Sequence, residues 1–149
     1  MLGKFQTSEL RIEVKASSSI IQESLMNLEQ LQKWFFPLKF TEHNSSVLEE
    51  GDCFSCDLGL VKVKNQVQII NSNCFRLILS EGIDGYQEWC WGDGWVQSRL
   101  EGISLFPLNL AQTLNLLRLR GWLTTVNKDD SSVENNSEAK NEISIDEDE

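Results

Sequence analysis

Apolar and polar residues alternate strictly near the start of the chain. Leu10, Ile12 and Val14 are separated by charged side chains, which is the period of a half-buried strand. A run of serines then offers helix N-cap candidates, and apolar residues between positions 20 and 31 recur at helical spacing before Pro37. The pattern predicts a strand over residues 9–15 and one or two short helices over about 18–35.

Short alternating runs fill the middle of the chain, and no helical period is sustained between residues 38 and 105. Glycine-containing segments at 49–52, 82–85 and 92–94 separate these runs, as expected of turns between strands. We therefore predict a meander of antiparallel strands. The residues expected to face inward are Phe54, Cys56, Leu58, Val61, Val63, Val67, Ile69, Phe75, Leu77 and Leu79.

A helical period returns after the last of these strands. Leu110, Ala111, Leu114 and Leu117 recur every three or four residues, and further leucines widen this apolar stripe. We expect one long, mostly buried helix after the sheet, which Gly121 ends or kinks. The leucines that widen the stripe are Leu108, Leu116, Leu119 and Leu123.

Negative charge is concentrated at the C-terminal end. The whole chain has a net charge of −10, and residues 128–149 hold nine carboxylates against two lysines, which leaves −3 for residues 1–127. The last stretch also has few large apolar side chains to offset the entropy of ordering it. We predict one domain over residues 1–127 and a disordered acidic tail over 128–149.

Several classes of protein are disfavoured by the sequence. Basic residues are scattered, so we expect no nucleic-acid binding. The first residues include no uninterrupted apolar segment typical of a secretion signal, and no stretch reaches the roughly 18 apolar residues of a membrane span. We expect a cytoplasmic protein. In such a reducing compartment the four cysteines, Cys53, Cys56, Cys74 and Cys90, are expected to be thiols.

Candidate catalytic and metal-binding residues are few. Cys53 and Cys56 have C-x-x-C spacing, but positions i and i+3 of a strand face opposite sides of a sheet, which argues against a zinc site or a redox pair. His43 and Tyr86 are the single histidine and tyrosine, and either has the chemistry of a general acid or base. Spacing along the sequence alone does not identify a hydrogen-bonding partner for either side chain. We expect no metal and no cofactor, and we favour a protein without catalytic activity.

Several segments resemble the START-like, or SRPBCC, superfamily. Residues 25–37 read LMNLEQLQKWFFP, similar to the segment in which a leucine-bearing helix of the superfamily runs into a tryptophan and a proline. EGDCF, KVKNQVQII and CFRLILS, within residues 50–80, are similar to three of its strands. The superfamily includes polyketide cyclases, birch-pollen-allergen-like proteins and homologues of the heat-shock ATPase activator.

The resemblance covers about residues 8–125 and implies an α+β helix-grip fold. In that fold short helices follow the first strand, and a curved antiparallel sheet of about six or seven strands wraps around a long C-terminal helix. Many members have an apolar cavity between the sheet and this helix. The cyclases need polar groups that polarise a carbonyl and move protons, and this chain offers little beyond its one histidine and one tyrosine.

The aromatic residues are the main candidates for lining such a cavity. Trp89 and Trp91 share one strand face, and others are expected to point inward with them. The alternative interpretation is that these rings simply fill the space between sheet and helix. The candidate ligand-binding residues are Trp34, Phe54, Phe75, Trp89, Trp91, Leu114 and Leu117.

These patterns favour a non-enzymatic domain that binds a small apolar ligand or lipid between the sheet and the C-terminal helix. Two alternatives remain open. One is a protein-interaction module similar to the heat-shock ATPase activator homologues, which would act through a surface containing Trp95 or through the acidic tail. The other is a cyclase-like enzyme, which would require a polar dyad inside the cavity.

Overall fold

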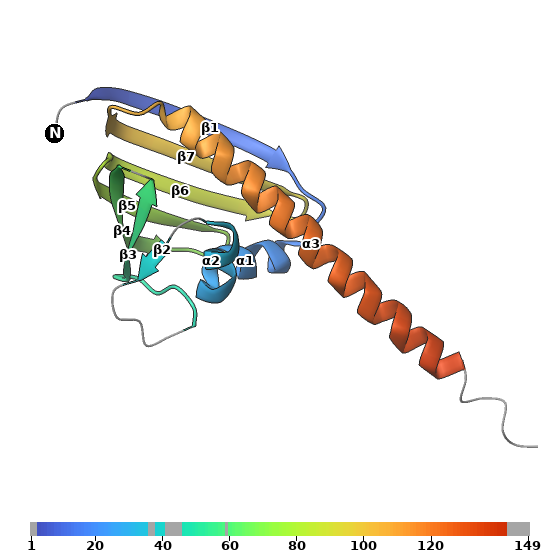
Figure 1. Cartoon of the computed structure of the whole chain (residues 1–149). Helices are drawn as coiled ribbons and strands as arrows, with labels where there is room; N and C mark the ends of the chain where they lie inside the picture. Colours follow the sequence, from blue (N-terminus) through green and yellow to red (C-terminus); the bar gives the residue numbers. More distant parts are fainter. Residues whose placement is uncertain (1–2, 36–37, 41–45, 59, 143–149) are drawn as a thin grey trace, which may run out of the picture.

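The computed structural model describes residues 3–35, 38–40, 46–58 and 60–142. One strand is followed by two short helices, six further strands and a long helix (Figure 1). The elements are β1 (Lys4–Glu13), α1 (Ser18–Met26), α2 (Leu28–Trp34), β2 (Leu38–Phe40), β3 (Cys53–Leu58), β4 (Val61–Ile70), β5 (Cys74–Glu81), β6 (Asp84–Gly92), β7 (Trp95–Ser104) and α3 (Leu108–Glu142).

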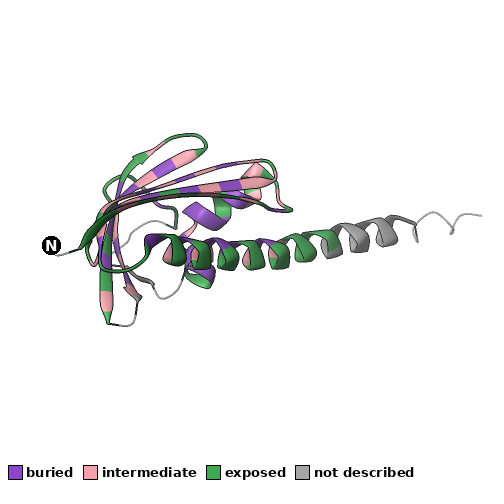
Figure 2. Cartoon of the chain, turned by 90° about the horizontal axis from the view of Figure 1, so that it is seen from above, coloured by how far each residue is buried: buried purple, intermediate pink, exposed green. Residues whose placement is uncertain are grey.

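The strands form one antiparallel sheet in the order β1-β7-β6-β5-β4-β3-β2. All strands except β1 follow chain order, and β1 pairs with β7 along its whole length, which is why it begins as early as Lys4. The sheet curves over α3, while α1 and α2 pack beside α3 on the same side (Figures 1 and 2). This is the α+β helix-grip arrangement that the sequence predicts.

Two short helices over residues 18–35 are also as predicted. Ser17 caps α1 by accepting a hydrogen bond from the backbone N–H of Ile20. Asn27 ends α1 through its own backbone N–H and caps α2, because its side-chain oxygen accepts from the N–H of Gln30 at 3.2 Å. A single asparagine between the helices thus satisfies backbone groups of both.

Among the strand side chains that the structure describes, which do not include that of Leu58, the predicted inward positions hold with one exception, in β4. Val63 and Val67 are buried, but Ile69 is 43% exposed. A β-bulge shifts the register between Val67 and Ile69, and an extra residue in a strand reverses the face of each side chain that follows it. The expectation that Ile69 faces inward is therefore wrong, and Ile70 packs against the core instead.

The side of α3 that is buried differs from the one that the sequence predicts. Leu110, Leu114 and Leu117 are between 45% and 56% exposed. The side that packs against the sheet and the short helices is the opposite one. Its buried members are Leu108, Gln112, Leu116, Leu119 and Leu123. Leucines occupy both stripes, so helical periodicity could not distinguish them.

The long helix also continues further than the sequence indicates. Gly121 neither ends it nor interrupts it, and α3 runs past Lys128 to Glu142. A helix that has been nucleated on the domain gains one hydrogen bond for each further residue, so polar residues can extend it. Residues 127–131 are nevertheless exposed, and α3 projects beyond the sheet (Figure 1).

We predict that residues 128–149 add little to the stability of the domain. Deleting them should change the free energy of unfolding by less than about 0.5 kcal/mol, because residues 127–131 bury no side chain. Thermal denaturation followed by circular dichroism would measure this. Deletion from residue 120 is the positive control, since it also removes Leu123, which is 1% exposed. A fall of many degrees for the shorter deletion would show that the segment packs on the domain.

Candidate binding cavity

A cavity of about 500 Å³ lies between the sheet and the first turns of α3. This volume is within the range of small-molecule sites in proteins. Leu110 and Leu114 lie at its rim, since each is more than half exposed. Much of the remaining lining is apolar and includes Phe35, Val63, Leu79, Ile83, Leu100 and Ala111.

The position of α3 explains why this space is open. The helix packs against β1 and β7 at one side of the sheet, where Leu108 and Leu116 are buried. The cavity lies beside this contact, over the inner face of the strands from β3 to β7. The exposed leucine stripe of α3 therefore borders the cavity, while the buried stripe holds the helix in place.

A buried polar network fixes the helix next to the cavity. The Gln112 side chain donates through Nε2 to the backbone oxygen of Ser98 at 2.7 Å and to Ser98 Oγ at 3.0 Å. Its Oε1 accepts a hydrogen bond from Ser8 Oγ at 2.6 Å. Gln87, which lines the cavity, donates through Nε2 to Ser98 Oγ at 3.1 Å. One glutamine thus joins α3 to β1 and β7, and a shared serine joins it to the cavity wall on β6.

Cys56 contributes a neutral sulfur to the cavity wall. Burial raises the pKa of its thiol from 9.0 to about 12, although a hydrogen bond from Asn65 opposes the shift. The thiol is therefore protonated at neutral pH, where it is a poor nucleophile and a poor metal ligand. Its neighbour in the C-x-x-C, Cys53, lies on the other face of β3, as strand geometry predicts.

The raised pKa of Cys56 predicts a loss of stability in alkaline solution. Above pH 9 the thiol of the unfolded chain loses its proton while the folded thiol keeps it until about pH 12, so rising pH favours the unfolded state. The stability of the wild type should fall relative to Cys56→Ala, approaching about 1.4 kcal/mol per pH unit above pH 9. Urea denaturation between pH 8 and 10.5 measures both curves. If the stability of both proteins depended on pH in the same way, the raised pKa of Cys56 would be contradicted.

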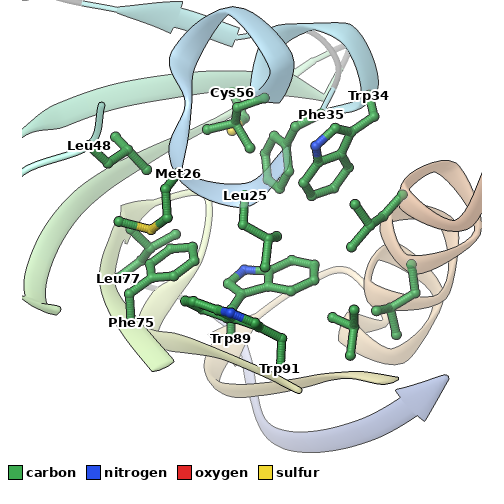
Figure 3. Close-up of a cluster of buried hydrophobic side chains, with 14 of the residues drawn as sticks. Leu25, Met26, Trp34, Phe35, Leu48, Cys56, Phe75, Leu77, Trp89 and Trp91 are labelled. Carbon is green, nitrogen blue, oxygen red and sulfur yellow. The ribbon is translucent and has the colours of Figure 1, made fainter. Parts of the chain in front are cut away.

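The five aromatic candidates from the sequence lie next to the cavity in the packed core. Trp34, Phe54, Phe75, Trp89 and Trp91 are each 1–3% exposed. Trp89 and Trp91 point from the sheet toward Leu25 of α1 and Trp34 of α2 (Figure 3). The void lined by Trp34, Phe54, Phe75 and Trp89 is about 10 Å³, about the smallest that holds one water.

The two leucine candidates on α3 are placed differently from each other. Leu114 lines the cavity of 500 Å³. Leu117 is 45% exposed and is not part of the described lining. The structure therefore brings Leu114 to the cavity and gathers the aromatic rings in the adjacent core. The sequence analysis missed Asn65 and Gln87, although each has the strand parity of buried neighbours.

Tyr86 and Trp95 lie on the outer face of the sheet. The Tyr86 hydroxyl donates to Glu101 Oε2 at 2.9 Å, and this hydrogen bond is the main cause of a raised Tyr86 pKa. Trp95 is half-buried beneath Arg11, whose guanidinium carbon is 4.1 Å from the ring centre. His43, the other acid–base candidate, lies outside the described residues. Tyr86 is thus separated from the cavity by the sheet.

The expectation that all four cysteines are thiols is wrong for two of them. Cys74 and Cys90 occupy directly opposed positions of β5 and β6 and form a disulfide, with their Cα atoms 4.2 Å apart. The pairing register of the two strands brings them together, which cysteine spacing alone does not reveal. Within the described part of the chain, no group of three or more His, Cys, Asp or Glu side chains is arranged to hold a metal ion.

Comparisons with known proteins place the fold but not the activity. No family model matches the sequence, and no curated protein matches it either. CalU16 from Micromonospora echinospora has a TM-score of 0.62 and 13% identity, over 80% of this chain and 76% of CalU16. This likeness shows that the two proteins share the helix-grip fold. No helix of this helix-grip domain, among the residues described, is long and apolar enough to cross a membrane.

Two further structures share the helix grip. DynU16, a protein of the dynemicin biosynthetic locus, has a TM-score of 0.61 and 15% identity over 80% of this chain. The match spans 47% of DynU16, which is therefore much longer than the matched region. The Aha1 dimer from Colwellia psychrerythraea has a TM-score of 0.56 and 17% identity, over 79% of this chain and 96% of Aha1.

Proposed function

We propose that this helix-grip domain binds a small, largely apolar ligand in the cavity between its sheet and α3. The observation that carries the proposal is a cavity of about 500 Å³ with a mostly apolar wall and an exposed leucine rim. Each 100 Å² of apolar surface removed from water contributes about 2.5 kcal/mol. Such a ligand would therefore need no charged partner to bind.

Ligand binding has more support than the two alternatives. For the cyclase-like enzyme, the described cavity lining includes neither a histidine nor a tyrosine. For the interaction module, Arg11 covers the Trp95 ring and leaves less apolar surface there for a partner. DynU16 belongs to a biosynthetic locus, which fits a fold that accommodates small molecules.

Titration with N-phenyl-1-naphthylamine tests the proposal. This neutral fluorophore emits more strongly in apolar surroundings, and we expect a saturable rise with one site per chain. Ala111→Trp should weaken binding at least about tenfold, because Ala111 lines the cavity and a larger side chain would occupy it. Thr113→Trp is the matched control, since Thr113 is exposed on the same helix. No saturable signal from the wild type would overturn the proposal.

A further inference from the structure

Asn65 is a polar residue in the apolar wall of the cavity, and its amide has a defined orientation. The residue is 2% exposed and lines the cavity. Its Nδ2 lies 3.5 Å from the backbone oxygen of Phe54, 3.3 Å from that of Val63 and 3.4 Å from Cys56 Sγ. Backbone oxygens can only accept hydrogen bonds, so the nitrogen and not the oxygen of the amide must lie on this side.

The other end of the same amide has no partner within the protein. Oδ1 of Asn65 accepts no hydrogen bond from any residue that the structure describes. Among the described residues, the fully buried side-chain nitrogen and oxygen atoms without a partner are Trp91 Nε1 and Trp122 Nε1. Asn65 Oδ1 is not one of them, so this acceptor is accessible from the cavity rather than sealed in the core. The cavity that Asn65 lines is the space from which a donor can reach this oxygen.

The described lining of the cavity has no net formal charge, because its two charged residues, Asp57 and Arg118, have opposite signs. Gln87 lines the same cavity and directs its Nε2 to Ser98 Oγ, and its Oε1 accepts no hydrogen bond within the described residues. Cys56 beside Asn65 is a protonated thiol at neutral pH because burial raises its pKa. Asn65 Oδ1 and Gln87 Oε1 are therefore amide acceptors without a protein donor, in a described lining whose formal charges balance.

We infer that the ligand carries a neutral hydrogen-bond donor, a hydroxyl or an amide N–H on an apolar skeleton, which binds Asn65 Oδ1. This inference rests on the proposed function and specifies the chemical class of the ligand. An ether, a ketone or a carboxylate at the same position presents only acceptors, so it would leave Asn65 Oδ1 unpaired and add repulsion between oxygens. A site built to pair with a ligand hydroxyl binds analogues without this hydroxyl much more weakly.

A pair of compounds of nearly equal shape provides the test. 2-Naphthol has the donor and 2-methoxynaphthalene lacks it, and each is measured by its displacement of N-phenyl-1-naphthylamine from the full chain. 2-Naphthol is expected to bind the wild type about tenfold more tightly or better. Burial of the additional methyl group would by itself favour 2-methoxynaphthalene, so the hydrophobic effect alone predicts the opposite order.

Two variants locate the preference. Asn65→Leu, which keeps a similar side-chain size, should abolish the preference for 2-naphthol. Asn115→Leu, which replaces another amide in the cavity lining, should retain it. If circular dichroism shows that Asn65→Leu does not fold, Asn65→Ala takes its place. If the folded variant at position 65 still binds 2-naphthol more tightly than 2-methoxynaphthalene, the inference is overturned.

The wild-type measurements separate failure of this inference from failure of the proposed function. Equal binding of the two compounds, tighter binding of 2-methoxynaphthalene, or binding of neither where N-phenyl-1-naphthylamine binds would overturn the donor requirement alone. Failure of N-phenyl-1-naphthylamine itself to bind would overturn the cavity proposal and the inference with it.

Discussion

Trp89→Ala is expected to lower the free energy of unfolding by about 3–5 kcal/mol, as replacement of a large core aromatic usually does. Trp89 is 1% exposed, and its ring packs edge-on against Trp34 with the ring centres 5.8 Å apart. Trp34 is itself fixed by a hydrogen bond from its Nε1 to the backbone oxygen of Ser24 at 2.8 Å. The substitution would leave a cavity at the contact between α1, α2 and the sheet.

Trp95→Ala is the matched control for this prediction. It makes the same chemical change in the same sheet, but on the outer face, where Trp95 is half-buried and contacts Arg11. A cation–π contact of this kind contributes about 0.5–1 kcal/mol, so the loss should stay below about 2 kcal/mol. Urea denaturation measures both variants. A loss under about 1 kcal/mol for Trp89→Ala would contradict its placement in the packed core.

Gln112→Ala is expected to cost at least about 3 kcal/mol, because it removes a fully buried side chain together with its hydrogen bonds to β1 and β7. Gln112 is 0% exposed and is the point at which α3 is joined to both β1 and β7. Its removal would affect Ser98 O, Ser98 Oγ and Ser8 Oγ together. Equilibrium denaturation with urea measures the loss of stability.

Gln112→Met separates hydrogen bonding from side-chain volume. Methionine has a similar length and fills the same space, so a remaining loss of about 2 kcal/mol would come from the lost hydrogen bonds. The exposed neighbour Thr113 provides a control, since Thr113→Ala should change stability by less than about 0.5 kcal/mol. A methionine variant as stable as the wild type would show that the network does not hold the helix.

The sheet and the short helices could be predicted from the sequence because their local patterns agree with their burial. Alternation around Trp89 and Trp91 identified the inner face of β6, and serine followed by helical spacing identified α1. The side of α3 that is buried could not be predicted in the same way. Leu110 and Leu116 belong to opposite sides of the helix, and only packing against the sheet decides which side is buried.

The polar residues of the cavity wall are the part of the site that the sequence analysis missed. Asn65 lies between Val63 and Val67 at inward-facing positions, and Gln87 has the same parity as Trp89. A polar residue at such a position is a signal that strand alternation alone can provide.

The Cys74–Cys90 disulfide also has a signal in the sequence once the turn between β5 and β6 is located. Both cysteines are equally far from Gly82 in this turn, so a hairpin centred there places them opposite each other.

The location of a bound ligand is the central claim, and methyl NMR tests it most directly. With leucine and alanine methyl groups labelled, titration with N-phenyl-1-naphthylamine should shift the signals of Leu79, Leu100 and Ala111, which line the cavity. The signals of Leu25 and Leu77, which pack among the aromatic rings, should move little. Saturable shifts at the first group are the predicted result. Shifts confined to Leu25 and Leu77, or no shifts at all, would contradict a binding site between the sheet and α3.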